Sequence, residues 1–160
     1  MVTITTPPLP AGSLLARHRG TECYRDAFLA SVPGTITLED FIAAFYASAA
    51  FLPERKVLSL IGRGASPSDI AALAAGRTSN FAAWSVEARE ADQILLRDFQ
   101  DRTCSWLQVE PQDDSTRLWF GSGVRHPDSA VFRALMPAHR WYARQLLAGA
   151  VRRLLKGHPA

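Results

Sequence analysis

A change in the spacing of apolar residues near position 81 limits the folds open to this chain more than any other feature. From there on, Trp84, Val86 and Ala88 alternate with polar or charged residues, which is the pattern of a strand with one buried face. Further strands, separated by short polar turns, are predicted at 93–99, 103–110 and 116–125. Four successive strands joined by short links indicate an antiparallel meander.

The C-terminal segment supplies a helix that can cover one face of such a sheet. Asp128 or Ser129 can cap a helix that runs to about Leu155. Pro137 lies inside this helix and predicts a kink or break near Met136, with the longer of two segments docked on the sheet. The apolar face of the helix is expected to contain Phe132, Leu135, Met136, His139, Ala143, Leu146, Leu147, Ala150 and Leu154.

Shorter elements are predicted before the meander. Residues 22–29 are expected to form a first strand. Three helices are expected to follow, at 38–50, 53–61 and 66–76. Thr37 and Ser66 stand at the N-cap positions of the first and third of these helices, and each is followed three residues later by an aspartate.

These elements predict one α+β domain, a curved antiparallel sheet wrapped on the long C-terminal helix, with the short helices inserted after the first strand. A chain of 160 residues has the usual size of a single domain. Residues 1–20, which include three prolines, are expected to form an extended arm, and residues 21–156 the domain. Gly121 and Gly123 remove side chains from one face of the last strand, which permits a bend of the sheet or close approach of a ligand or helix, and we expect a bend rather than contact with a ligand.

Composition narrows the location and the partners of the protein. No apolar run approaches the roughly 20 residues that cross a bilayer, and the N-terminus lacks the pattern of a signal peptide. We therefore expect a cytoplasmic protein without membrane insertion, in which Cys23 and Cys104 are free thiols. Six of the 18 basic residues follow Asp128, the last acid. They can attract an anionic partner or form a solvated helix face, but their pattern argues against nucleic acid, and a homodimer stays open.

Several stretches resemble the family known as domain of unknown function 2867. They are Tyr24-Arg25-Asp26-Ala27-Phe28, the helix with Phe41, Ala44 and Phe45, the strand pair 93–109, Pro137-Ala138-His139-Arg140 and Ala143-Arg144-Gln145-Leu146-Leu147. The chain departs from the family pattern at Ala138, where Phe is common, and at Thr103, where His is common. The element order also resembles START-like helix-grip proteins, in which a curved sheet wraps a C-terminal helix around a cavity. The resemblance implies this fold and implies no reaction.

His139 is the strongest single candidate for a functional side chain, because it falls on the apolar face of the last helix, where an imidazole needs a polar partner. Aromatic side chains from several strands can line an apolar cavity. The predicted ligand-binding residues are Trp84, Trp106, Phe120 and His139. Each has a structural explanation as well, as a packed core residue or a hydrogen-bonded histidine. The other histidines lack metal-ligand spacing and no glycine-rich phosphate loop is present, so neither a metal nor a cofactor is expected.

Three functions remain open. The first is binding of a small apolar or amphipathic ligand between the sheet and the C-terminal helix. The second is an enzyme of cyclase, hydratase or isomerase type, in which His139 is the acid or base and Arg97 or Arg117 holds an anion. The third is an interaction module whose partner docks on the basic helix face or the arm. Acyl transfer is disfavoured, because no nucleophile-elbow spacing surrounds Ser105 or Ser122.

Overall fold

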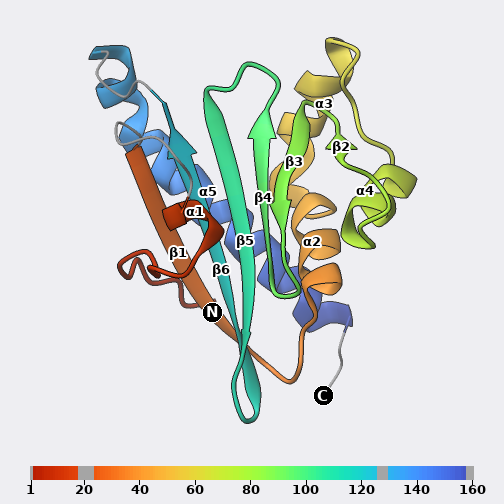
Figure 1. Cartoon of the computed structure of the whole chain (residues 1–160), viewed down its shortest axis with the longest axis vertical. Helices are drawn as coiled ribbons and strands as arrows, with labels where there is room; N and C mark the ends of the chain where they lie inside the picture. Colours follow the sequence, from red (N-terminus) through yellow and green to blue (C-terminus); the bar gives the residue numbers. More distant parts are fainter. Residues whose placement is uncertain (1, 18–23, 126–129, 158–160) are drawn as a thin grey trace.

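A six-stranded antiparallel sheet with the order β1-β6-β5-β4-β3-β2 organises the chain (Figure 1). The structure is a computed structural model and describes residues 2–17, 24–125 and 130–157. The strands are β1 (Tyr24–Pro33), β2 (Asn80–Phe81), β3 (Trp84–Arg89), β4 (Gln93–Asp98), β5 (Thr103–Pro111) and β6 (Ser115–Val124). The predicted meander is confirmed, and β1 extends the sheet by pairing along its length with β6. The short strand β2, with only two residues, escaped prediction.

The helices lie before and after the meander. They are α1 (Leu14–Arg17), α2 (Leu38–Tyr46), the short 3-10 helix η1 (Ala49–Phe51), α3 (Leu52–Leu60), α4 (Pro67–Ala74) and α5 (Ala130–Gly157). The curved sheet and the long C-terminal helix, with the short helices after β1, give the predicted α+β helix-grip architecture. The predicted break in α5 is wrong, because the helix continues through Pro137. Pro137 is exposed, so the carbonyl that loses its helical donor can bond to water. The expected N-cap at 128 or 129 lies outside the described residues.

Local sequence explains where α2 and α4 begin. The Thr37 hydroxyl accepts from the Asp40 amide at 3.1 Å, and the Asp40 carboxylate accepts from the Thr37 amide at 3.2 Å. Ser66 and Asp69 form the same reciprocal pair at the start of α4. Both predicted caps are therefore confirmed as capping boxes, which satisfy backbone amides that the helix itself leaves unpaired.

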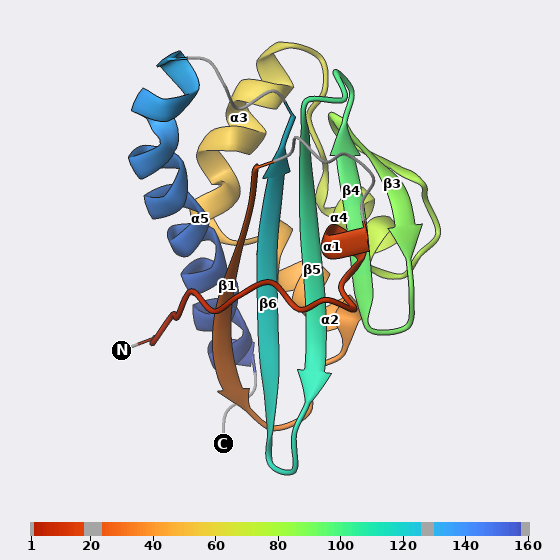
Figure 2. The same ribbon diagram turned by 60° about the vertical axis from the view of Figure 1, so that its left-hand side comes forward.

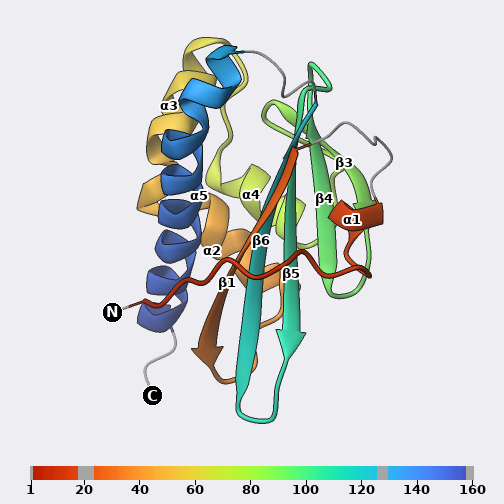
Figure 3. The same cartoon turned by 90° about the vertical axis from the view of Figure 1, so that its left-hand side faces the viewer.

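One face of the sheet is covered by α2 and α5, which lie side by side (Figure 3). Phe28 of β1 and Phe120 of β6 are buried beneath them, and the ring of Phe120 lies 4.8 Å from that of Phe45 in α2. The second half of α5 is buried in this core through Ala143, Leu146, Leu147, Ala150, Val151 and Leu154. The first half of α5 contains no buried residue, although its sheet-facing stripe of Phe132, Met136, His139 and Tyr142 is half-buried. Only the second half of α5 is therefore packed into the core, and the first half is partly exposed.

The other face of the sheet is covered by the N-terminal segment, which crosses β1, β6 and β5 (Figure 2). The expectation of a purely extended arm is wrong for its last part, because α1 packs on this face with Leu14 and Leu15 buried. Gln93 holds α1 in place: its side-chain oxygen accepts from the Leu14 amide at 2.8 Å and from the Trp106 indole at 2.9 Å. Gln93 is buried in β4, and these two hydrogen bonds satisfy its side-chain oxygen and join the arm to the sheet.

Gly121 explains how α1 comes so close to the sheet. A Cβ at this position would lie 2.7 Å from Leu15 Cδ2 and 2.8 Å from Trp106 Cε3. The glycine therefore makes room for a helix and an indole on the outer face. Sequence analysis left close approach of a helix open beside the expected bend, and the structure shows such an approach at Gly121.

Candidate functional site

The four residues predicted to bind a ligand do not line one space. Trp106 lies on the outer face, where it packs with Trp119 and the N-terminal segment. Phe120 is buried on the opposite face within the aromatic core. Trp84 is half-buried at the far side of the sheet, with its ring 6.3 Å from that of Phe51. The predicted grouping is therefore wrong for Trp106. In the pairing of β5 with β6, Trp106 lies opposite Gly121, whereas Phe120 lies opposite the next residue of β5. Consecutive residues of a strand point to opposite faces of the sheet, so Trp106 and Phe120 are on different faces.

His139 instead meets two polar residues of the sheet. Its Nε2 lies 2.9 Å from the Ser122 hydroxyl and 3.6 Å from Asp26 Oδ2. Asp26 Oδ1 accepts from the Ser122 hydroxyl at 2.6 Å and from the Ser122 amide at 3.1 Å. The pairing of β1 with β6 brings Asp26 and Ser122 opposite each other, and the partly buried first half of α5 places His139 over both.

The hydrogen-bond network of this cluster assigns its protons. An ionised carboxylate only accepts, so the single hydroxyl proton of Ser122 goes to Asp26. Nε2 of His139 then donates to the Ser122 oxygen, and in the neutral ring Nδ1 is left as an acceptor. Among the described residues Nδ1 has no hydrogen-bond partner, and the side chain of His139 is 35% exposed. The accessible nitrogen is therefore a base directed away from the serine, and the arrangement is unlike a nucleophile with its base.

The carboxylate of Asp26 is the fixed charge of the cluster. Burial raises its pKa, but hydrogen bonding with His139 and Ser122 outweighs burial and holds the pKa below its usual range. The Tyr24 hydroxyl donates to Asp26 Oδ2 at 3.2 Å. Burial and the neighbouring carboxylate together raise the pKa of Tyr24 to about 12, so this phenol stays protonated at neutral pH.

The arginines expected to assist His139 lie on the other side of the sheet. Arg97 pairs with Glu87 and Asp101, and Arg117 donates to Glu110 at 3.3 Å. Both are odd-numbered residues of strands whose even-numbered neighbours belong to the core shared with α2 and α5, so the expectation that either holds an anion beside His139 is wrong.

A second ionisable pair joins α3 to α5 one turn further along from His139. The Tyr142 hydroxyl donates to Glu54 Oε2 at 3.0 Å. Burial raises the pKa of Glu54, and the hydrogen bond from Tyr142 offsets this only in part. Sequence analysis passed over Glu54, because a glutamate in the first turn of a helix normally indicates a favourable interaction with the helix dipole.

A groove of ≈ 930 Å³ lies between the N-terminal segment, β1 and the second half of α5. Ile4, Leu29, Ala148 and Val151 contribute apolar surface to it. Arg144 and Arg152 line it from α5, and none of its described lining residues is acidic. The two arginines are eight residues apart, which places them roughly 12 Å apart along the helix.

The wall of this groove formed by the N-terminal segment is attached at defined points. Thr5 and Leu29 exchange two backbone hydrogen bonds at 2.9 and 3.0 Å, and Arg144 donates to the Thr6 hydroxyl at 3.2 Å. Leu29 therefore directs its amide and carbonyl away from β6. Because these directions alternate along a strand, Ser31 also directs its amide towards the outer edge, where it lines the groove.

Comparisons with known proteins leave the chain without an assigned relative. Searches against models of protein families, against curated proteins and against solved structures each returned no significant match. Membership of the family named above therefore stays a prediction. Among residues 2–17, 24–125 and 130–157, no cluster of three or more His, Cys, Asp or Glu side chains could hold a metal ion. No helix within these ranges has the length and apolar character needed to cross a membrane.

Proposed function

We propose that the protein binds a small amphipathic anion in the groove between the N-terminal segment, β1 and α5. The observation that carries this proposal is the combination of an apolar lining with Arg144 and Arg152, without a described acidic residue. The groove has a volume of ≈ 930 Å³, within the usual range for small-molecule sites. It adjoins both the sheet edge and the C-terminal helix, so the proposal keeps the predicted kind of ligand and changes the residues that bind it.

A long-chain carboxylate fits this lining best. Its hydrocarbon chain would lie on Leu29, Ala148 and Val151, and its head group would meet Arg152 or Arg144. Guanidinium groups bind carboxylates through two parallel hydrogen bonds, and the outward amide of Ser31 offers a further donor. An uncharged ligand would leave both arginines without the anion that they can pair with.

Fluorescence titration with 11-(dansylamino)undecanoate tests the proposal, with dodecanoate and dodecanol as competitors. Dodecanoate should displace the probe at much lower concentration than dodecanol. Arg152→Gln should weaken probe binding about tenfold, which corresponds to ~1.4 kcal/mol. Arg153→Gln is the matched control, because the neighbouring Arg153 does not line this groove, and it should leave binding unchanged. Equal competition by the alcohol, or equal effects of the two substitutions, would refute the proposal.

An acid–base enzyme is the second candidate, and the cluster of Asp26, Ser122 and His139 favours it. Asp26 and Ser122 hold Nε2 of His139, and the partly exposed Nδ1 can take a proton from a bound molecule. This requires the Nε2–H tautomer of the neutral ring. Nitrogen NMR of the histidine side chains, assigned with His139→Gln, should show that tautomer in the neutral ring. A ring that carries its proton on Nδ1 would remove the base and with it this candidate.

A further inference from the structure

Exposed apolar side chains gather at one end of the molecule, away from the groove. Those on α3 and just after it include Val57, Leu60 and Ile61, with exposures of 60%, 87% and 58%. Those on the first half of α5 are Val131, Leu135 and Trp141, with exposures of 68%, 59% and 64%. We call these six residues the apical surface. A single exposed leucine is ordinary, but a group of this size on two neighbouring helices indicates a surface that something covers.

The two helices meet where Tyr142 contacts Glu54, and from there they diverge towards opposite sides of the same end of the molecule (Figure 1). At the end of α3, Arg63 lies over the ring of Phe99, another exposed aromatic residue, with 4.2 Å from Cζ to the ring centroid. The turn between β4 and β5 therefore extends the same end of the molecule.

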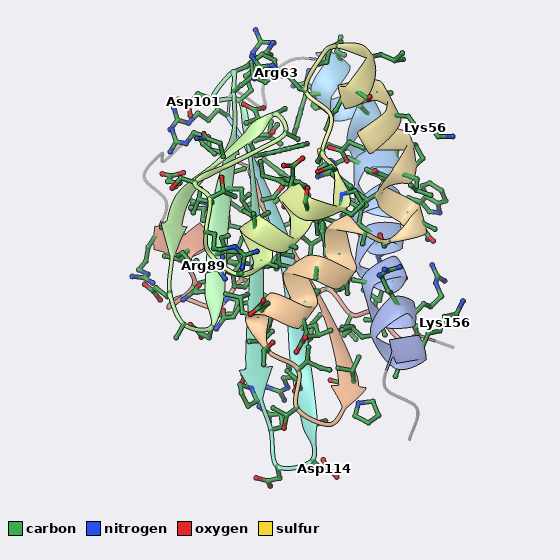
Figure 4. All side chains as sticks on the ribbon, turned by 90° about the vertical axis from the view of Figure 1, so that its right-hand side faces the viewer. Lys56, Arg63, Arg89, Asp101, Asp114 and Lys156 are labelled. Atoms are coloured by element: carbon green, nitrogen blue, oxygen red, sulfur yellow. The ribbon has the colours of Figure 1, made fainter. Side chains whose placement is uncertain are left out.

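The formal net charge of the two helices is positive. The sequence of α5 contains six basic residues and no acid. In α3 the one acid, Glu54, is engaged with Tyr142, and Lys56 projects away from the sheet (Figure 4). Arg63 and Arg140 add positive charge beside the apical surface. A partner must therefore offer negative charge and an apolar phase together.

From this combination we infer that the apical surface docks on the surface of an anionic lipid bilayer, with α3 and the first half of α5 lying on it rather than crossing it. Anionic head groups complement Lys56, Arg63 and Arg140, and Leu60 and Trp141 can enter the boundary between head groups and acyl chains. Apolar residues on one face with lysine, arginine and tryptophan beside them are typical of helices that bind this boundary. Nucleic acid would match the charge, but it offers no comparable apolar phase to Val57, Leu60 or Leu135.

Co-sedimentation with vesicles tests this inference on the whole chain. Binding is expected to vesicles that contain equal amounts of phosphatidylcholine and phosphatidylglycerol, and not to phosphatidylcholine alone. The double variant Leu60→Ser, Trp141→Ser should lose at least about tenfold in partitioning, since both side chains would leave water on binding. Leu155→Ser is the matched control for vesicle binding, because Leu155 is an apolar residue of α5 exposed at 47% that lines the groove and lies outside the apical surface.

A second pair of variants tests the charge. Lys56→Glu should weaken binding to the anionic vesicles more than Lys156→Glu, which makes the same change at the opposite end of the molecule (Figure 4). Unfolding temperatures should match the wild type, because all the substituted side chains are exposed. The inference fails if anionic vesicles bind no protein, or if the apical variants behave like their controls. If vesicles bind neither the wild type nor the double variant while a single-stranded oligonucleotide binds both equally, the inference fails in favour of nucleic acid. It does not depend on the groove, and Arg152→Gln should leave docking of the apical surface intact.

Discussion

Substitution of Gly121 by alanine gives the most direct test of how the N-terminal segment is held. The added Cβ would lie 2.7 Å from Leu15 Cδ2 and 2.8 Å from both the Asp26 carbonyl oxygen and Trp106 Cε3. Carbon atoms pack at about 3.5–4.0 Å, so the contacts with Leu15 and Trp106 are about 1 Å too short. The contact with the carbonyl oxygen is also shorter than real Cβ contacts. Two of the three atoms belong to a buried indole and to the backbone of the neighbouring strand, which cannot rotate away.

The expected cost follows from this overpacking. Extra methyl groups forced into filled cores destabilise by about 1–3 kcal/mol, and the upper part of this range applies when backbone must move. In a chain of this size, each kcal/mol lowers the unfolding temperature by roughly 2–4 °C. Gly121→Ala should therefore lower it by about 4–12 °C. Gly12→Ala is the control, because no atom lies within 4 Å of the Cβ that it would add.

Urea unfolding of a double-mutant cycle with Leu15→Ala isolates the contact with α1. Leu15 is fully buried, so its truncation alone should cost about 2–5 kcal/mol. In that background the alanine at position 121 has lost one of its three clashes, and its cost should fall by about 0.5 kcal/mol or more. A neutral Gly121→Ala, or a cost that is the same with and without Leu15, would refute the argument that this glycine admits α1 to the sheet.

Three further predictions concern buried and capping polar groups. The pKa of Asp26 is lower in the folded chain than in the unfolded one, so its carboxylate stabilises the fold above the unfolded pKa of about 3.9, and this contribution is lost as pH falls through the folded pKa. Asp26→Asn should therefore show a smaller loss of stability than the wild type in urea titrations from neutral pH to about pH 3. The pKa of Glu54 is raised, so its ionisation opposes folding as pH rises through the unfolded value; Glu54→Gln, which keeps an acceptor for Tyr142, should be at least as stable as the wild type near pH 8 by thermal unfolding. Ser66→Ala should cost about 1 kcal/mol by urea unfolding, because it removes the N-cap of α4, whereas Ser68→Ala, in the first turn of the same helix, should cost clearly less.

The elements that sequence analysis located correctly are those with a local physical cause. Strands β3 to β6 followed from alternating polarity and short turns, and α2 and α4 from capping residues followed by helical spacing. Errors arose where a rule for local sequence takes no account of the tertiary surroundings of the residue. Pro137 predicted a break on helix-interior grounds, but an exposed position lets water replace the lost hydrogen bond.

The candidate site was only partly visible in the sequence. His139 was identified by its place on an apolar helix face, yet its partners Asp26 and Ser122 are 113 and 17 residues away in the chain and carry no motif. Trp106 was assigned to the wrong side of the sheet. The alternation of side chains along one strand shows which residues share a face, but it does not show which of the two faces packs against the helix. The groove went unpredicted, since three separate segments build it.

By itself, the sequence determined the order and kind of most elements, the antiparallel meander and the basic character of α5, because these depend on neighbours within a few residues. Tertiary structure alone decided which face of the sheet each strand residue serves, how Gly121 admits Leu15, and where His139 finds Asp26 and Ser122. These outcomes depend on contacts between segments far apart in the chain. The physical reason is that strand pairing and close packing select the partners of a side chain only after the whole sheet has formed.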